Sequence, residues 1–77
     1  MTNLEKYENA FIECVGVERE QLKGLNYQDA EWDSVGHMSL IAAIEEAFDI
    51  MLDTDDIIDF SSFEKGKEIL EKYDVEL

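Results

Sequence analysis

The chain of 77 residues contains no proline, a single cysteine and four scattered glycines. Without proline, and without runs rich in glycine or serine, it has no candidate for an interdomain linker, an internal repeat or a low-complexity tract. Its one cysteine, Cys14, cannot form an intramolecular disulfide. We therefore expect a single domain covering residues 1–77, small enough that its core depends on efficient helix packing.

Long hydrophobic runs are also missing. Hydrophobic residues make up 45% of the chain, which is enough for a core, but they are spread along it and never form a segment that could cross a bilayer. Residues Met1 to Lys6 lack the basic and then apolar arrangement of a secretory signal. These absences predict no membrane span and a cytoplasmic location.

Basic residues are scarce, because 20 acidic residues stand against 6 basic ones and give a formal net charge of −14. A phosphate-rich surface would repel such a chain, so nucleic acid and anionic membranes are excluded as expected partners. No Lys or Arg occurs between Lys23 and Lys65. The acidic residues in that stretch are Asp29, Glu31, Asp33, Glu45, Glu46, Asp49, Asp53, Asp55, Asp56, Asp59 and Glu64. Basic proteins are the expected partners, and a solvated acidic face is the alternative explanation.

The first third of the chain predicts one helix and a long connection. Thr2-Asn3-Leu4-Glu5 fits a capping box. The apolar stripe that follows, which includes Cys14 as a packing residue, predicts a helix to about residue 15 that ends at Gly16. The stripe consists of Leu4, Tyr7, Phe11 and Cys14. From Gly16 to Trp32 the periodicity fades, which predicts a long loop pinned to the core. Its expected anchors are Val17, Leu22, Leu25, Tyr27 and Trp32.

Three more helices are predicted in the remainder. Residues 34–49 are apolar around most of the helix circumference, so this helix is expected to be central. Thr54-Asp55-Asp56 is typical of the cap and acidic first turn of a short helix. Ser61-Ser62-Phe63-Glu64 fits another capping box before a last helix. We expect an all-α fold, a small four-helix bundle with three main helices, a short third helix and a long loop after the first.

The candidate site is Ser34, which lies between Asp33 and Val35 at the start of the second predicted helix. A hydroxyl at a junction between loop and helix is accessible to a modifying enzyme. The free N–H groups of the first helical turn and the helix dipole favour an anion there, such as a phosphodiester on Ser34.

Several features of the chain resemble the acyl carrier proteins. Asp33-Ser34-Val35 matches the family's hallmark triplet, and the aliphatic run 40–44 is followed by Glu45-Glu46-Ala47-Phe48-Asp49 and an acidic turn before a short helix. The resemblance covers about residues 3–73. It implies a bundle of the acyl-carrier type in which Ser34 bears 4′-phosphopantetheine. A separate phosphopantetheinyl transferase, the holo-carrier synthase, would attach this arm from coenzyme A.

The resemblance also implies a role and partners. The protein would be a monomeric carrier without enzymatic activity that holds acyl or aminoacyl cargo as a thioester. It would meet an acyl- or aminoacyl-loading enzyme and acyltransferases or synthases with basic docking patches. The residues expected to recognise partners are Asp33, Val35, Glu45, Glu46, Asp55 and Asp56. Those expected to contact the arm or an acyl chain are His37, Met38, Ile41 and Ile57.

The chain departs from carriers of the fatty-acid type in the turn after the serine. Gly36, His37 and Ser39 occupy positions where further acids are usual, and Trp32 stands directly before Asp33. This pattern is more similar to stand-alone carriers of specialised pathways. Gly36 costs a helix about 1 kcal/mol relative to alanine, which indicates either close approach of the arm or a partner, or a frayed first turn.

Two other functions compete. Asp33, Ser34 and His37 are the residue types of a hydrolytic triad, but three groups crowded at one helix start can hardly form its geometry. The other is a calcium-binding or adaptor role without a prosthetic group. An EF-hand loop counted from Asp53 needs glycine at its sixth position, where Ile58 stands, so no metal site is expected.

Overall fold

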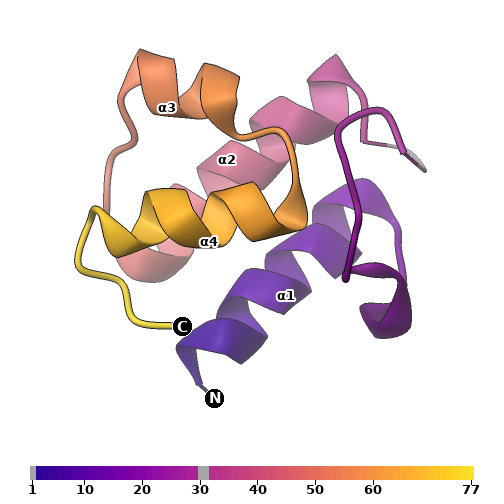
Figure 1. Ribbon diagram of the computed structural model, residues 1–77, viewed down its shortest axis with the longest axis horizontal. Coiled ribbons are helices and arrows are strands. Elements are labelled where there is room, and N and C mark those ends of the chain that lie inside the picture. The colour runs from indigo at the N-terminus through magenta and orange to yellow at the C-terminus, as the bar shows by residue number, and fades with distance from the viewer. Residues whose placement is uncertain (1, 30–31) are drawn as a thin grey trace.

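The computed structural model describes residues 2–29 and 32–77 and shows a small helical protein (Figure 1). Its helices are α1 (Asn3–Val15), α2 (Ser34–Phe48), α3 (Thr54–Asp59) and α4 (Phe63–Glu71). The described residues contain no strand, only an isolated bridge between Asn26 and Ser62. The expected all-α class is confirmed, with three longer helices and one short one.

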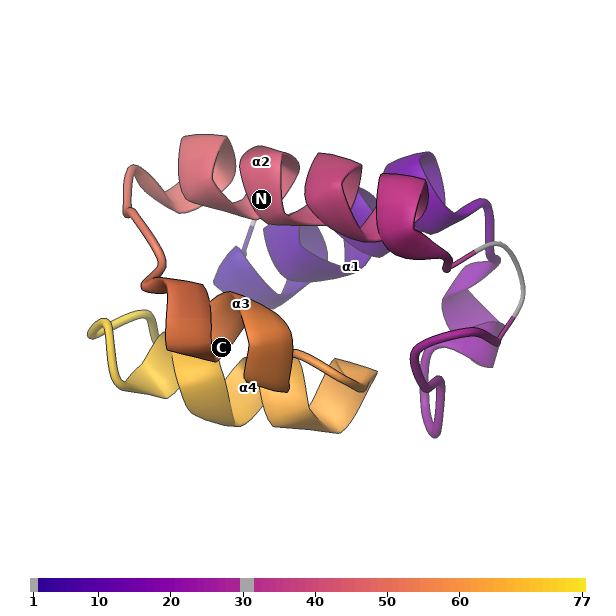
Figure 2. The same cartoon turned by 90° about the horizontal axis from the view of Figure 1, so that it is seen from above.

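The helices lie in two groups, α1 with α2 and α3 with α4, joined by residues 49–53. Figure 2 shows α2 on one side of the molecule and α3 with α4 on the other, and α1 packs against α2. The loop after α1 lies at one end of the molecule, and it includes one turn of 3₁₀ helix, Arg19–Gln21. The chain termini meet where the Asn3 side chain donates to the carbonyl oxygen of Glu76 at 2.9 Å.

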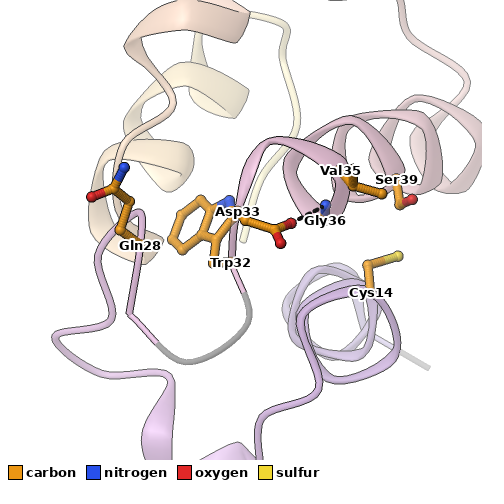
Figure 3. A pocket seen from close by; sticks show the side chains of 7 residues that line it. All are labelled: Cys14, Gln28, Trp32, Asp33, Val35, Gly36 and Ser39. Atoms are coloured by element: carbon orange, nitrogen blue, oxygen red, sulfur yellow. Dashed lines mark hydrogen bonds between the residues drawn. The ribbon is translucent and has the colours of Figure 1, made fainter.

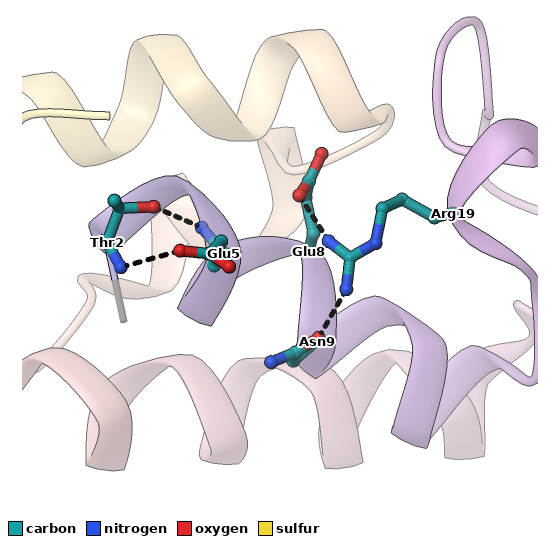
Figure 4. A network of polar contacts seen from close by, with 5 residues as sticks. All are labelled: Thr2, Glu5, Glu8, Asn9 and Arg19. Carbon is teal, nitrogen blue, oxygen red and sulfur yellow. Dashed lines mark hydrogen bonds and ion pairs between the residues drawn. The ribbon is translucent and has the colours of Figure 1, made fainter.

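Polar side chains fix both ends of α1. The predicted capping box is confirmed, because the Thr2 hydroxyl accepts from the backbone N–H of Glu5 and the Glu5 carboxylate accepts from that of Thr2 (Figure 4). Gly16 ends the helix in a left-handed conformation with φ of 74°. Arg19 then ties the loop back to α1 through Glu8 and Asn9.

The other helix ends differ from the sequence predictions by one residue. α2 stops at Phe48, with Asp49 as a left-handed C-cap, and α3 is capped at Asp53 instead of Thr54. Ser62 caps α4 by accepting from the N–H of Lys65. The capping box predicted for residues 61–64 is therefore wrong, because the third helical residue is a lysine, which has no acceptor to offer.

The core is built around aromatic rings from several segments. Phe11 of α1 contacts the rings of Tyr7, Trp32 and Phe63 at centroid separations of 5.1, 5.2 and 5.2 Å. The loop anchors are confirmed as buried, with Tyr27 partly so, and they are Val17, Leu22, Leu25 and Trp32. Cys14 lies at the edge of the core and is only half-buried, and this partial burial raises the pKa of its thiol.

An ion pair fastens α3 to α4. The Asp56 carboxylate accepts hydrogen bonds from Lys72 Nζ and from the Tyr73 hydroxyl, both at 2.6 Å, and the residue is buried. These contacts, that with Lys72 first, lower the pKa of Asp56. Asp56 was expected to contribute to partner recognition, but its carboxylate is buried and paired with Lys72 and Tyr73.

Within the described residues, every helix is too short or too polar to traverse a bilayer.

Gly66 generates the first prediction. A Cβ there would lie 2.1 Å from the Tyr7 hydroxyl oxygen and 2.4 Å from Phe60 Cζ. Alanine gains about 1 kcal/mol of helix propensity, but overpacking against buried rings costs up to about 3 kcal/mol. We expect Gly66→Ala to lower the free energy of unfolding by about 2 kcal/mol in urea titrations. Glu68→Ala, an exposed change in the same helix, is the control. A Gly66→Ala protein as stable as wild type would contradict this packing.

Asp56 generates the second prediction. Because its pKa is lowered in the folded state, the ionised carboxylate stabilises the fold above the ordinary Asp value of about 3.9. That contribution disappears as the pH falls through the lower folded-state value. We expect Asp56→Asn to lower the urea midpoint at neutral pH and to reduce its further fall in acid. Asp55→Asn, an exposed neighbour in α3, should follow the wild-type profile. If the urea midpoints of wild type and Asp56→Asn fell equally in acid, ionised Asp56 would not stabilise the fold.

Candidate functional site

Ser34 is the first residue of α2 and is exposed to solvent. The chain just before it is held firmly, because the Trp32 side chain is fully buried. The backbone N–H of Trp32 donates to the Asp29 carbonyl at 3.1 Å, and the backbone carbonyl of Trp32 accepts from the N–H of Gln28 at 2.8 Å. Only Asp33 separates this fixed core side chain from the accessible hydroxyl of Ser34. The position of Ser34 is therefore set by the core, although its side chain lies in solvent.

Asp33 is the N-cap of α2. Its Oδ1 accepts from the N–H of Gly36 at 2.9 Å, and its backbone carbonyl accepts from the N–H of His37 at 2.7 Å. The first turn is therefore a regular helix, so the frayed turn considered for Gly36 is not present. The carboxylate also takes up part of the anion-binding capacity expected at this helix start, and a phosphodiester on Ser34 would share it with Asp33.

A hollow lies beside this helix start, between α1 and α2. It has a volume of about 730 Å³ and includes Cys14 of α1, which faces the side of α2 that carries Val35 and Ser39 (Figure 3). Gly36 is buried and lines this hollow. Ser34 is not among the lining residues.

His37 links three segments. Its Nδ1 accepts from the indole Nε1–H of Trp32 at 3.0 Å, and its Nε2 lies 2.9 Å from the Ile57 carbonyl oxygen of α3. Because Nδ1 accepts, the proton lies on Nε2, which donates to Ile57 and makes the imidazole neutral. Both nitrogens are thus engaged away from Ser34, which is not the arrangement that a hydrolytic triad requires.

A second hollow of about 380 Å³ lies between α2 and α3. Its lining residues are Tyr27, His37, Met38, Ile57, Ile58, Phe60 and Ser61. The structure brings together three of the four residues expected to contact an arm or acyl chain. Ile41 is the exception: it is only 2% exposed and belongs to the core, because a helix turns about 60° between positions 38 and 41.

Sequence reasoning missed the other lining residues of this hollow. Ile58 follows Ile57 in a predicted short helix, but Tyr27, Phe60 and Ser61 come from the loop and from the end of α3, where no periodicity signals a shared surface. Only the tertiary fold brings them to α2.

The acidic residues expected to recognise partners divide into two groups. Asp33, Glu46 and Asp55 are exposed. Glu45 is half-buried, and its Oε2 accepts from the N–H of Leu52 at 2.9 Å, which fastens the connection between α2 and α3. Glu45, like Asp56, is therefore committed at least in part to the fold.

Exposed apolar side chains lie in the first turns of α2 and on α3. Val35 is 74% exposed, Met38 59% and Ile58 72%. Large hydrophobic side chains left in solvent next to one another are typical of a surface that meets another molecule. In the part of the chain that the structure describes, no group of three or more His, Cys, Asp or Glu side chains could hold a metal ion.

Compared with known proteins, the chain matches no family model, no curated protein and no solved structure.

The cap at Asp33 generates a prediction. Replacing a capping Asp by alanine removes the acceptor for Gly36 N–H and typically costs about 1 kcal/mol, whereas asparagine keeps an acceptor. We expect Asp33→Ala to lower the free energy of unfolding by about this amount and Asp33→Asn to stay close to wild type in thermal and urea unfolding. An Asp33→Ala protein as stable as Asp33→Asn would show that the cap contributes nothing.

Proposed function

We propose that the protein is an acyl carrier in which Ser34 bears a 4′-phosphopantetheine arm and acyl or aminoacyl cargo is held as a thioester on that arm. The observation that carries this proposal is the exposed hydroxyl of Ser34 in the first turn of α2, fixed by the buried Trp32 and capped by Asp33. The four-helix arrangement and the Asp33-Ser34-Val35 triplet agree with the acyl-carrier type of bundle.

The surroundings of Ser34 favour an acceptor of modification over a catalyst. Both nitrogens of His37 are engaged elsewhere, so the hydroxyl lacks the adjacent base that a nucleophilic serine needs. A separate transferase would supply that base. The serine oxygen would form a new bond to phosphorus, the pyrophosphate bond of coenzyme A would break, and adenosine 3′,5′-bisphosphate would leave.

The hollow between α2 and α3 is suited to receive the arm or a small cargo. His37 and Met38 lie three and four residues after Ser34, on the same face of α2, and both line this hollow. An arm attached at Ser34 can therefore run along α2 into it. Tethering raises the local concentration of cargo at each enzyme that the carrier meets.

The charge of the exposed surface favours basic partners. Asp33, Glu46 and Asp55 are exposed, and no Lys or Arg occurs between Lys23 and Lys65. Such a surface would steer a phosphopantetheinyl transferase, loading enzymes and acyltransferases that carry basic docking patches. The exposed apolar side chains near Ser34 would form the centre of the same contact.

The decisive experiment measures intact mass after incubation with coenzyme A and a broad-specificity phosphopantetheinyl transferase. We expect wild type to gain one phosphopantetheinyl group because Ser34 is accessible at a fixed helix start, and Ser34→Ala to gain none. Ser39→Ala removes another exposed serine of α2 and should be modified like wild type. No gain on wild type would leave an acidic adaptor without a prosthetic group, and a gain retained in Ser34→Ala would place the attachment elsewhere.

A further inference from the structure

His37 holds together the walls of the hollow next to Ser34. Its hydrogen bond from Trp32 fixes it to the loop, and its hydrogen bond to the Ile57 carbonyl fixes it to α3. The centroid of the His37 ring lies 5.4 Å from that of Tyr27 and 6.1 Å from that of Phe60. Both of these residues line the hollow. One half-buried side chain thus sets the distance between α2, α3 and the loop at a point one helical turn from Ser34.

This arrangement requires one particular protonation state. The lone pair on Nδ1 accepts the indole N–H of Trp32, so a proton taken up from solvent at Nδ1 would place two donors against each other. That hydrogen bond would break, while Nε2–H could still donate to Ile57. The buried indole N–H would lose its partner, and either His37 or Trp32 would have to move.

The groups around the ring do not compensate a positive charge. The loop contributes the Trp32 indole and the titratable phenol of Tyr27, and α3 contributes the Ile57 carbonyl and the Phe60 ring. On its own helix, Asp33 meets His37 through its backbone carbonyl. Within residues 2–29 and 32–77, the ion pairs join Arg19, Lys67 and Lys72 to carboxylates, and none involves His37.

We propose that His37 is a positioning residue for the modification of Ser34: its neutral form holds the loop in place beside the attachment site through Trp32, and its protonation releases the loop. This inference rests on the proposed carrier function, since the modified group is Ser34. An enzyme that reaches Ser34 approaches over the first turn of α2 and its neighbours, so a displaced loop would slow modification.

The chain offers a clean test, because it contains one histidine and one tryptophan. The first measurement follows the His37 imidazole and the Trp32 indole N–H by ¹⁵N NMR between about pH 8 and about pH 5, where imidazole side chains gain their proton. We expect both signals to change together in wild type. In His37→Gln, whose amide offers one acceptor and one donor and does not titrate, the indole signal should not follow this transition. An indole signal that ignores the protonation of His37 would overturn the proposal.

The second measurement compares the rates of Ser34 modification at the two ends of this pH range, with the same transferase for every protein. Dividing the wild-type ratio by that of His37→Gln cancels the titration of the enzyme itself. We expect the wild-type rate to fall by about threefold or more relative to His37→Gln towards acid pH. His37→Phe keeps a ring but loses both hydrogen bonds, so the rate at which its Ser34 is modified should show no such fall towards acid pH.

The outcomes separate the two proposals. If wild type is never modified at any pH, the carrier function is wrong, while the NMR titration still reports whether His37 governs Trp32. If Ser34 is modified and wild type and His37→Gln share one pH profile, the carrier function stands and the positioning role is wrong.

Discussion

The hydrogen bond between the buried indole of Trp32 and His37 is the constraint on which the candidate site depends. Trp32 has no exposed surface, so its N–H must find a partner inside the protein, and leaving it unpaired would cost about 1–3 kcal/mol. His37 provides that partner from the first turn of α2. Trp32 packs in the core against Phe11 and Phe60. Its hydrogen bond to His37 therefore fixes the start of α2 relative to the core, and Ser34 is exposed at a defined place.

The position of α3 follows from the same kind of constraint. A helix of six residues is too short to be stable by itself, so contacts from both sides must hold it. On one side the Ile57 carbonyl accepts from His37. On the other, Asp56 binds Lys72 and Tyr73, and the Tyr73 hydroxyl also accepts from the N–H of Asp53 at 3.0 Å. The hollow beside Ser34 thus has one wall whose place is determined by a few polar contacts.

Sequence patterns predicted what depends on local chemistry. The capping box at Thr2, the helix end at Gly16 and the loop anchors were predicted from the sequence around them, and they are confirmed. Sequence patterns did not predict the contacts that depend on residues far away in the sequence. Nothing near Asp56 in the sequence indicates that Lys72 and Tyr73 will enclose it, and nothing near Glu45 indicates its bond to Leu52. The indole N–H of Trp32 fixes the tautomer of His37, and the Nε2 proton then meets the carbonyl of Ile57, 20 residues away.

The distribution of ion pairs explains how an acidic protein can keep a strongly charged surface at one place. The three ion pairs among the described residues are Arg19–Glu8, Lys67–Glu64 and Lys72–Asp56. They lie on α1 with its following loop, on α4, and between α3 and α4, and none lies on α2. The basic side chains thus neutralise carboxylates that serve the fold, whereas Asp33 and Glu46 on α2 keep their charge at the surface. Because unpaired surface charges act over about 8–10 Å at physiological salt, the field at Ser34 depends on Asp33, which directly precedes it, more than on Glu46 at the far end of α2.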